Sequence, residues 1–250
     1  MKGKRLVIGL HAAESALNNV PDHILSVWID AQREDKRLNE LRQMLAKWGI
    51  VAQPATKKKL DALAEGGNHQ GIILELNAPA ERDEGDLREA LKQVNQGTVY
   101  LALDQVQDPH NLGACLRTAD AVGVKGVIIP RDQSASLTPA VARVASGAAE
   151  TVPVYRVTNL VRSLTLCKES GLWIMGAAGE SARSLYEIDM NVPLVVVVGA
   201  EGKGMRRLTR DHCDFLVNIP MYGQVESLNL SVATGVLLYE ALRQRLSSSK

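Results

Sequence analysis

The sequence is poor in aromatic residues, in excess charge of either sign and in long apolar runs. Aromatic residues make up 4% of the chain, with a single Phe, so the cores must be built from aliphatic side chains. That composition suits an α/β protein better than an all-β sandwich. The 29 basic and 28 acidic residues leave a formal net charge of +1. A polyanionic partner would therefore have to be bound by local basic patches rather than by a global field.

The sequence also lacks paired cysteines, a metal-ligand cluster and a membrane segment. Cys115, Cys167 and Cys213 are widely spaced and form no C-x-x-C pair, which predicts reduced, packed thiols and no metal site. No apolar run approaches about 18 residues. The basic N-terminus is followed only by a short apolar stretch at 6–10, unlike a signal peptide. We therefore expect a cytoplasmic protein without a membrane partner.

Apolar runs and helix-like stretches alternate along the chain in two blocks. Residues 1–77 predict a small α/β domain. The segment that follows, reading NAPAERDEGD over 77–86, loses all periodicity, and we predict a linker over 78–96. Residues 97–250 contain runs that resemble strands buried on both faces, which predicts a mostly parallel sheet. The runs lie at 99–103, 126–129, 152–155, 172–175 and 194–198.

The first motif reads DPHNLGACLR over 108–117 and directly follows a predicted strand. Asp108 or Asn111 can cap a helix there, and Pro109 suits its first turn. Capping does not explain Arg117, which stands among small and apolar residues. Asn111 and Arg117 are therefore candidates for contact with a phosphate or a ribose.

The second motif reads GAEGKGM over 199–205, after the apolar run at 194–198. Its glycines allow a ligand to approach the backbone closely. The spacing fits neither the G-x-G-x-x-G of dinucleotide folds nor a P-loop. Glu201 would repel a phosphate but can accept hydrogen bonds from a ribose hydroxyl or an amine, which favours a cationic cofactor. A simple turn is the alternative interpretation.

The third motif reads SLN over 227–229 and opens the last predicted helix, 227–245, whose apolar residues predict that it is largely buried. Ser227 is the expected N-cap, with Asn229 nearby. Polar groups at the start of so apolar a helix need partners, which a ligand can supply.

The three motifs, in this order and spacing, resemble those of the SpoU/TrmH branch of the SPOUT methyltransferases. The resemblance extends to IGLHA at 8–12, GGNHQGII at 66–73 and RVASGAAE at 143–150. It implies an L30e-like RNA-binding domain followed by an α/β domain tied in a trefoil knot. It also implies a homodimer that transfers a methyl group from S-adenosylmethionine to a guanosine ribose of 23S ribosomal RNA.

The resemblance also assigns the site residues. The positions that match catalytic or substrate-orienting residues are Asn111, Arg117, Glu201, Ser227 and Asn229. The positions that match cofactor-binding residues, which act mainly through backbone groups, are Ala177, Gly179, Gly199, Ile219 and Leu228. Because arginine does not give up its proton in proteins, we expect Arg117 to stabilise negative charge rather than act as a base. The alternatives are the same reaction on tRNA or another ribosomal site, a non-catalytic RNA-binding assembly factor, and a Rossmann-type nucleotide enzyme. The last lacks its glycine fingerprint.

Overall fold

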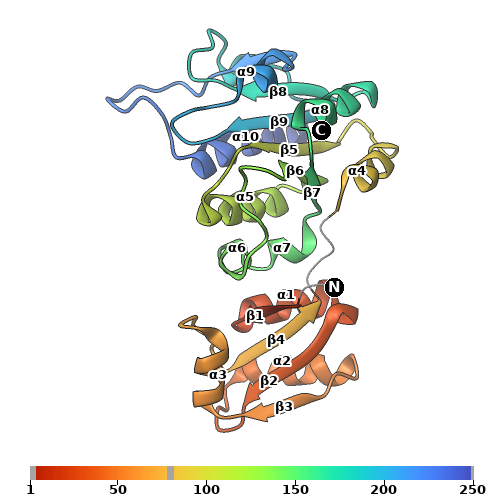
Figure 1. Cartoon of the computed structure of the whole chain (residues 1–250), viewed down its shortest axis with the longest axis vertical. Helices are drawn as coiled ribbons and strands as arrows, with labels where there is room; N and C mark the ends of the chain where they lie inside the picture. The colour runs from red at the N-terminus through yellow and green to blue at the C-terminus, as the bar shows by residue number, and fades with distance from the viewer. Residues whose placement is uncertain (1–3, 78–81, 249–250) are drawn as a thin grey trace. The chain divides into compact units, whose positions relative to one another are not determined.

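The computed structural model describes residues 4–77 and 82–248, which fall into two compact units. Unit 1 is Met1–Ala80 with Leu137–Thr151, and unit 2 is Glu81–Ser136 with Val152–Lys250. Figure 1 shows both units and labels most of their helices and strands. The predicted domain boundaries at 77 and 97 remain predictions, because the two compact units are defined by contacts in space and are not continuous segments of the sequence.

Unit 1 is built on a four-stranded sheet in the order β1-β4-β2-β3. Strand β4 is antiparallel to β1 and β2, whereas β3 is parallel to β2. Helices α1 and α2 pack on one face of the sheet, and α3 packs on the other through Leu60 and Ala64. The elements are β1 (Lys4–Ile8), α1 (Leu10–Asn19), η1 (Pro21–His23), β2 (Ile24–Asp30), α2 (Lys36–Lys47), β3 (Ala52–Ala55), α3 (Lys57–Ala64) and β4 (Ile72–Asn77).

The start of α1 is fixed by a residue far away in the sequence. Gly9 precedes the helix and offers no side chain to cap it. Instead, Oε1 of Gln70 accepts a hydrogen bond from the N–H of Leu10 at 3.1 Å. Gln70 itself has a positive φ of 50°. The turn before β4 therefore provides the cap that α1 lacks.

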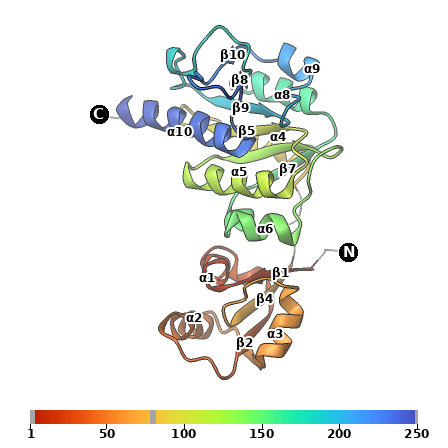
Figure 2. The same ribbon diagram turned by 90° about the vertical axis from the view of Figure 1, so that its left-hand side faces the viewer.

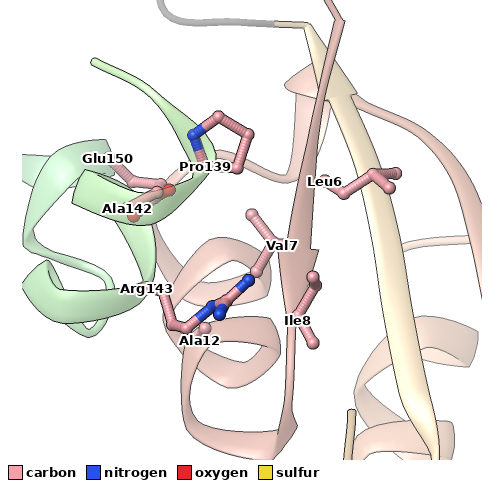
Figure 3. A pocket seen from close by; sticks show the side chains of 8 residues that line it. All are labelled: Leu6, Val7, Ile8, Ala12, Pro139, Ala142, Arg143 and Glu150. Carbon is pink, nitrogen blue, oxygen red and sulfur yellow. The ribbon is translucent and has the colours of Figure 1, made fainter. Parts of the chain in front are cut away.

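Two short helices, α6 (Pro139–Ala145) and α7 (Ala148–Thr151), also belong to unit 1. Arg5 of β1 forms a buried ion pair with Glu150, and burial raises the pKa of that carboxyl group. Beside this pair lies a small hollow between β1 and α6. Figure 3 shows the side chains that line it: Leu6, Val7, Ile8, Ala12, Pro139, Ala142, Arg143 and Glu150.

Unit 2 is built on a six-stranded sheet in the order β10-β8-β9-β5-β6-β7, in which every strand pair is parallel. The prediction of a mostly parallel sheet is confirmed, and each predicted strand lies within two residues of the observed one. The elements are β5 (Val99–Asp104), α5 (Pro109–Ala121), β6 (Gly126–Pro130), β7 (Val154–Val157), α8 (Leu160–Glu169), β8 (Trp173–Ala177), η2 (Leu185–Glu187), β9 (Leu194–Gly199), α9 (Arg207–Asp211), β10 (Phe215–Val217) and α10 (Leu230–Ser248).

Helices cover both faces of this sheet. Figure 2 shows α5 and α10 on one side and α4 (Glu84–Leu91) and α8 on the other. On the side of α8, Leu160 and Leu164 pack against alternate strand residues such as Val195 and Val197. Because helices cover both faces of the sheet, the strands are continuously apolar, as the sequence predicted.

Part of the predicted linker is helical. Residues 78–81 lie outside the described residues, but α4 (Glu84–Leu91) occupies much of the remaining range. Asp83 and Asp86 form a capping box at its start, with bonds of 2.9 and 3.1 Å. Leu87 and Leu91 join the core of unit 2. The sequence showed no periodicity here because the first turn of this short helix is polar.

Helix α10 is less buried than predicted. Leu230, Leu237, Leu238 and Ala241 face the core. A second stripe is exposed to solvent, because the side chains of Val232, Tyr239 and Leu246 are 52%, 53% and 61% exposed. These three residues are seven positions apart, so they lie on one side of the helix. The prediction of a largely buried helix was wrong for this side.

Candidate active site

The predicted site residues gather around the carboxyl ends of the central strands of unit 2. Gly199 ends β9 and pairs with Asp104, which ends β5. Ala177 ends β8 and pairs with Val217 of β10. Because these strands are parallel, the loops that follow them leave the sheet at one edge, where α/β folds bind their ligands.

Asn111 connects all three motifs. Its Nδ2 donates a hydrogen bond to Oε2 of Glu201 at 3.2 Å, and its Oδ1 accepts one from Nδ2 of Asn229 at 3.1 Å. These partners are 90 and 118 residues away in the chain. Asn111 is only 6% exposed, and both the nitrogen and the oxygen of its buried amide have a hydrogen-bond partner. The cluster of Asn111, Glu201 and Asn229 is therefore held in a fixed arrangement.

The start of α5 positions Asn111. Asp108 is the N-cap, and its side chain accepts a hydrogen bond from the N–H of His110 at 3.0 Å. Pro109 occupies the first helical position, where its missing N–H costs nothing. The predicted helix start is confirmed, with Asp108 rather than Asn111 as its cap. Asn111 is thus free to use its side chain in the cluster.

Gly199 lies at a place where the backbone crosses itself closely. A Cβ at this position would meet the carbonyl carbon of Gly204 at 2.0 Å and the nitrogen of Met205 at 2.1 Å. The loop closes through two backbone hydrogen bonds between Ala200 and Gly204, of 3.0 and 2.8 Å. Gly202 and Gly204 have positive φ angles of 76° and 67°. The glycines are therefore required by sterics, and the loop that presents Glu201 is compact.

A buried ion pair that the sequence did not reveal supports the end of this loop. Oδ1 of Asp104, which is fully buried, accepts bonds from Nε and Nη2 of Arg206 at 2.8 and 2.7 Å. Its Oδ2 accepts the backbone N–H of Arg206 at 2.9 Å. One signal was present: a carboxylate at the end of an apolar strand is rarely buried without a partner. The sequence could not identify that partner.

Two predicted cofactor residues present unpaired backbone groups. Within the described chain, neither the N–H nor the C=O of Ile219 or of Leu228 takes part in a hydrogen bond. Both residues are half-buried and follow β10, and Leu228 directly precedes Asn229 of the cluster. Ala177 is also half-buried, whereas Gly179 is exposed. Open backbone groups beside an ordered polar cluster are suited to hold a ligand with several donors and acceptors.

Arg117 and Ser227 are not part of the cluster. Both are exposed, and the described residues offer neither of them a side-chain hydrogen bond or an ion pair. Arg117 lies six positions after Asn111 on α5, on another side of the helix. The expectation that Ser227 caps α10 was wrong: Oδ1 of Asn229 accepts from the N–H groups of Ser231 and Val232, at 2.9 and 3.4 Å.

The cysteines are free, and burial raises the pKa of Cys115 to about 11 and that of Cys167 and Cys213 to about 12. Over residues 4–77 and 82–248, no group of three or more His, Cys, Asp or Glu residues is placed to hold a metal ion. In the same ranges, no helix is long and apolar enough to cross a membrane.

The parallel sheet, the tight glycine loop and the cluster that joins three motifs define the class of the SPOUT methyltransferases. Comparison with known families agrees: the profile of the SpoU rRNA methylase family matches residues 98–239. A second profile, for RNA 2′-O ribose methyltransferase substrate binding, matches residues 6–82. The chain therefore belongs to the SpoU rRNA methylase family, and the expected fold class is confirmed.

The chain is similar over its whole length to characterised members of the family. It is 49% identical to the 23S rRNA (guanosine-2′-O-)-methyltransferase RlmB of Shewanella oneidensis, covering 99% of this chain and 100% of that one. It is 51% identical to RlmB of Haemophilus influenzae, covering 97% and 98%. The SpoU methyltransferase AviRb of Streptomyces viridochromogenes, solved with AdoMet, shares the fold with a TM-score of 0.81 at 23% identity, covering 98% of this chain and 92% of that one.

Proposed function

We propose that this chain transfers a methyl group from S-adenosylmethionine to the ribose 2′-hydroxyl of a guanosine in 23S ribosomal RNA. The observation that carries the proposal is the Asn111 amide, which joins the three motifs through bonds to Glu201 and Asn229. Relatives about half identical over nearly the full chain bear the name of this reaction. The ribosomal RNA that they modify also supports a cytoplasmic location.

The cofactor would be held by backbone groups around the glycine loop. Ile219 and Leu228 offer open N–H and C=O groups, and Gly199, Ala177 and Gly179 line the same edge. When bound, S-adenosylmethionine supplies an electrophilic methyl group on a cationic sulfur. The carboxylate of Glu201 places negative charge at this edge, which suits a cation better than a phosphate.

The chain's own residues must make the ribose hydroxyl a better nucleophile and align it. A hydroxyl attacks poorly while it keeps its proton. That proton is released to water as the bond from oxygen to the methyl carbon forms and the bond from that carbon to sulfur breaks, so the negative charge that develops on the oxygen needs stabilisation. Arg117 keeps its proton and supplies a planar donor that can bind both that oxygen and the neighbouring phosphate. Asn111, fixed at both ends, orients the ribose, and the exposed hydroxyl of Ser227 is free to contact it. Alignment of donor and acceptor provides further acceleration.

We also propose that the protein is a homodimer in which Arg117 serves the site of the partner subunit. Arg117 points away from the cluster of its own chain, where the described residues give it no partner. On α10, which packs against α5, the exposed apolar stripe of Val232, Tyr239 and Leu246 provides a surface for a second copy. A symmetric pair would bury this stripe and bring the two sites together.

The domain assignment belongs to the same proposal. Residues 1–77 bind the RNA substrate, 78–96 connect the domains, and 97–250 carry the methyltransferase. The profile matches at 6–82 and 98–239 support this division. The exposed lysines Lys57, Lys58 and Lys59 provide basic charge for the RNA backbone in the first domain.

The test is methyl transfer from labelled S-adenosylmethionine to unmodified 23S RNA. The modified position is mapped by the resistance of its linkage to alkaline cleavage, and we expect one protected guanosine. Failure to bind S-adenosylmethionine would refute the cofactor assignment. Binding without transfer to 23S RNA would refute the substrate and favour a tRNA target or a non-catalytic assembly factor.

Subunit complementation tests the shared site. Asn111→Ala and Arg117→Ala are each expected to be inactive. If Arg117 acts across the interface, a heterodimer of the two variants contains one intact site, and random mixing restores about a quarter of the activity. If both residues act within one chain, mixing restores nothing, and the dimeric site is wrong.

A further inference from the structure

The loops that follow β5 and β6 form a polar cluster to which the reaction described above gives no role. Residues 105–107 and 131–136 lie against each other, because the N–H of Ala135 donates to the C=O of Val106 at 2.8 Å. The side-chain amides of Gln105 and Gln133 are hydrogen-bonded to each other. Gln105 directly follows Asp104, which ends β5, so this cluster lies at the same edge of the sheet as Asn111.

Both glutamines have a strained backbone. Gln105 has a φ of 66° and Gln133 a φ of 57°, in the left-handed region. This region disfavours side chains other than those of Gly, Asn, Asp and His, at a cost on the order of 1 kcal/mol or more for each residue. Two such residues in contact, on neighbouring loops, indicate a side-chain arrangement that is maintained despite its cost.

A buried arginine holds the second loop in place. Arg156 of β7 is 8% exposed, and its guanidinium donates to the C=O of Arg131 at 2.7 Å and to that of Ala135 at 3.3 Å. Both ends of the loop are therefore fixed. Between them, the hydroxyl of Ser134 is buried without a hydrogen-bond partner among the described residues. A rigid loop with an unsatisfied polar atom is suited to bind a ligand.

The free groups of this cluster match the edge of a guanine. Asp132 is exposed and has no hydrogen bond or ion pair within the described chain. Its two carboxylate oxygens can accept both N1–H and the 2-amino group, a pair of donors that adenine, cytosine and uracil do not present. The Gln105–Gln133 pair keeps three side-chain N–H groups, one on Nε2 of Gln105 and two on Nε2 of Gln133, and one of these can donate to O6. Because a carboxylate repels the phosphates of RNA, a base is a better partner for Asp132 than the RNA backbone.

The position of the cluster agrees with this role. The proposed cofactor residues Ala177, Gly199 and Ile219 lie at or just after the ends of β8, β9 and β10, whereas the cluster follows β5 and β6, which lie on the other side of β9 in the sheet. In a displacement, the attacking and leaving atoms lie on opposite sides of the methyl carbon. The target nucleotide therefore approaches from the side of β6.

We propose that Asp132, together with the Gln105–Gln133 pair, recognises the guanine base of the nucleotide to be methylated. This inference rests on the proposed function. Asp132 binds N1–H and the 2-amino group, and the amide pair binds O6. The arrangement explains how a site that reacts with a ribose, common to all four nucleotides, selects guanosine.

The test combines protein variants with a change in the substrate. Synthetic 23S RNA fragments carry either guanosine or inosine, which lacks the 2-amino group, at the target position. We expect inosine to lower kcat/KM of the wild type by about tenfold or more. Asp132→Asn should lower kcat/KM for the guanosine RNA by a similar factor and respond to inosine by less than about threefold. Gln133→Ala should be impaired but keep the full inosine effect, since inosine retains O6.

Controls separate the possible outcomes. Glu169→Gln removes the same charge from an exposed position on α8 and should behave as the wild type. Calorimetric titration with S-adenosylmethionine checks that each variant is folded. An inosine effect of equal size in the wild type and in Asp132→Asn overturns the inference. If the wild type does not methylate the guanosine RNA at all, the proposed function has failed instead.

Discussion

The ion pair between Asp104 and Arg206 predicts unequal costs for the removal of its two members. Asp104 is completely buried, whereas the side chain of Arg206 is 45% exposed. Arg206→Ala leaves a buried carboxylate with only the backbone N–H at 2.9 Å. Removing one member of a buried pair costs about 3–5 kcal/mol, and because one bond survives we expect about 3 kcal/mol.

Asp104→Ala should cost less. The guanidinium that it leaves behind reaches water, and the main loss is the bond to one backbone N–H. We expect a cost of about 1–2 kcal/mol. The double variant should cost less than Arg206→Ala alone, because it removes the buried charge. Arg207→Ala is the matched control: this side chain is 89% exposed and 3.7 Å from Asp211, so its cost should stay within about 0.5 kcal/mol.

Scanning calorimetry of the wild type and the four variants measures these differences. For a chain of this size, about 3 kcal/mol corresponds to a fall in Tm of roughly 6–12 °C. Two results would refute the reasoning. In the first, Asp104→Ala is more damaging than Arg206→Ala. In the second, the cost of the double variant equals the sum of the two single costs, which would mean that the pair does not interact.

Three further predictions follow from single contacts. Gly199→Ala places a methyl group 2.0 Å from the carbonyl carbon of Gly204, which is a severe steric clash. We expect loss of soluble, folded protein, which is measured by circular dichroism of the purified variant. Gln70→Ala removes the cap on Leu10 and should lower the free energy of unfolding in urea by about 1 kcal/mol, whereas an unchanged midpoint would contradict this role. Burial raises the pKa of the Cys115 thiol to about 11, above its value in the unfolded chain. The contribution of this thiol to stability is therefore fully present at neutral pH and declines as the pH rises from about 9 to about 11. The free energy of unfolding should decline less over this pH range in Cys115→Ala than in the wild type.

The sequence by itself determined the local structure and the chemical class of the site. The apolar runs located five of the six strands of this sheet to within two residues, because strands buried on both faces require continuous hydrophobicity, whereas the short edge strand β10 was not among them. Asp108 and Pro109 predicted the start of α5, since capping depends on neighbouring residues only. The glycines of 199–204 predicted a close backbone approach, and the order of the three motifs predicted the family.

The tertiary structure alone decided which residues meet. Asn111 meets Glu201 and Asn229 only because β5 and β9 pair and α10 returns beside α5, so no local pattern could show these hydrogen bonds. The same holds for Arg206 as the partner of Asp104, and for Gln70 as the cap of α1. Such contacts depend on the register of strands distant in sequence. Periodicity and capping preferences carry no information about that register.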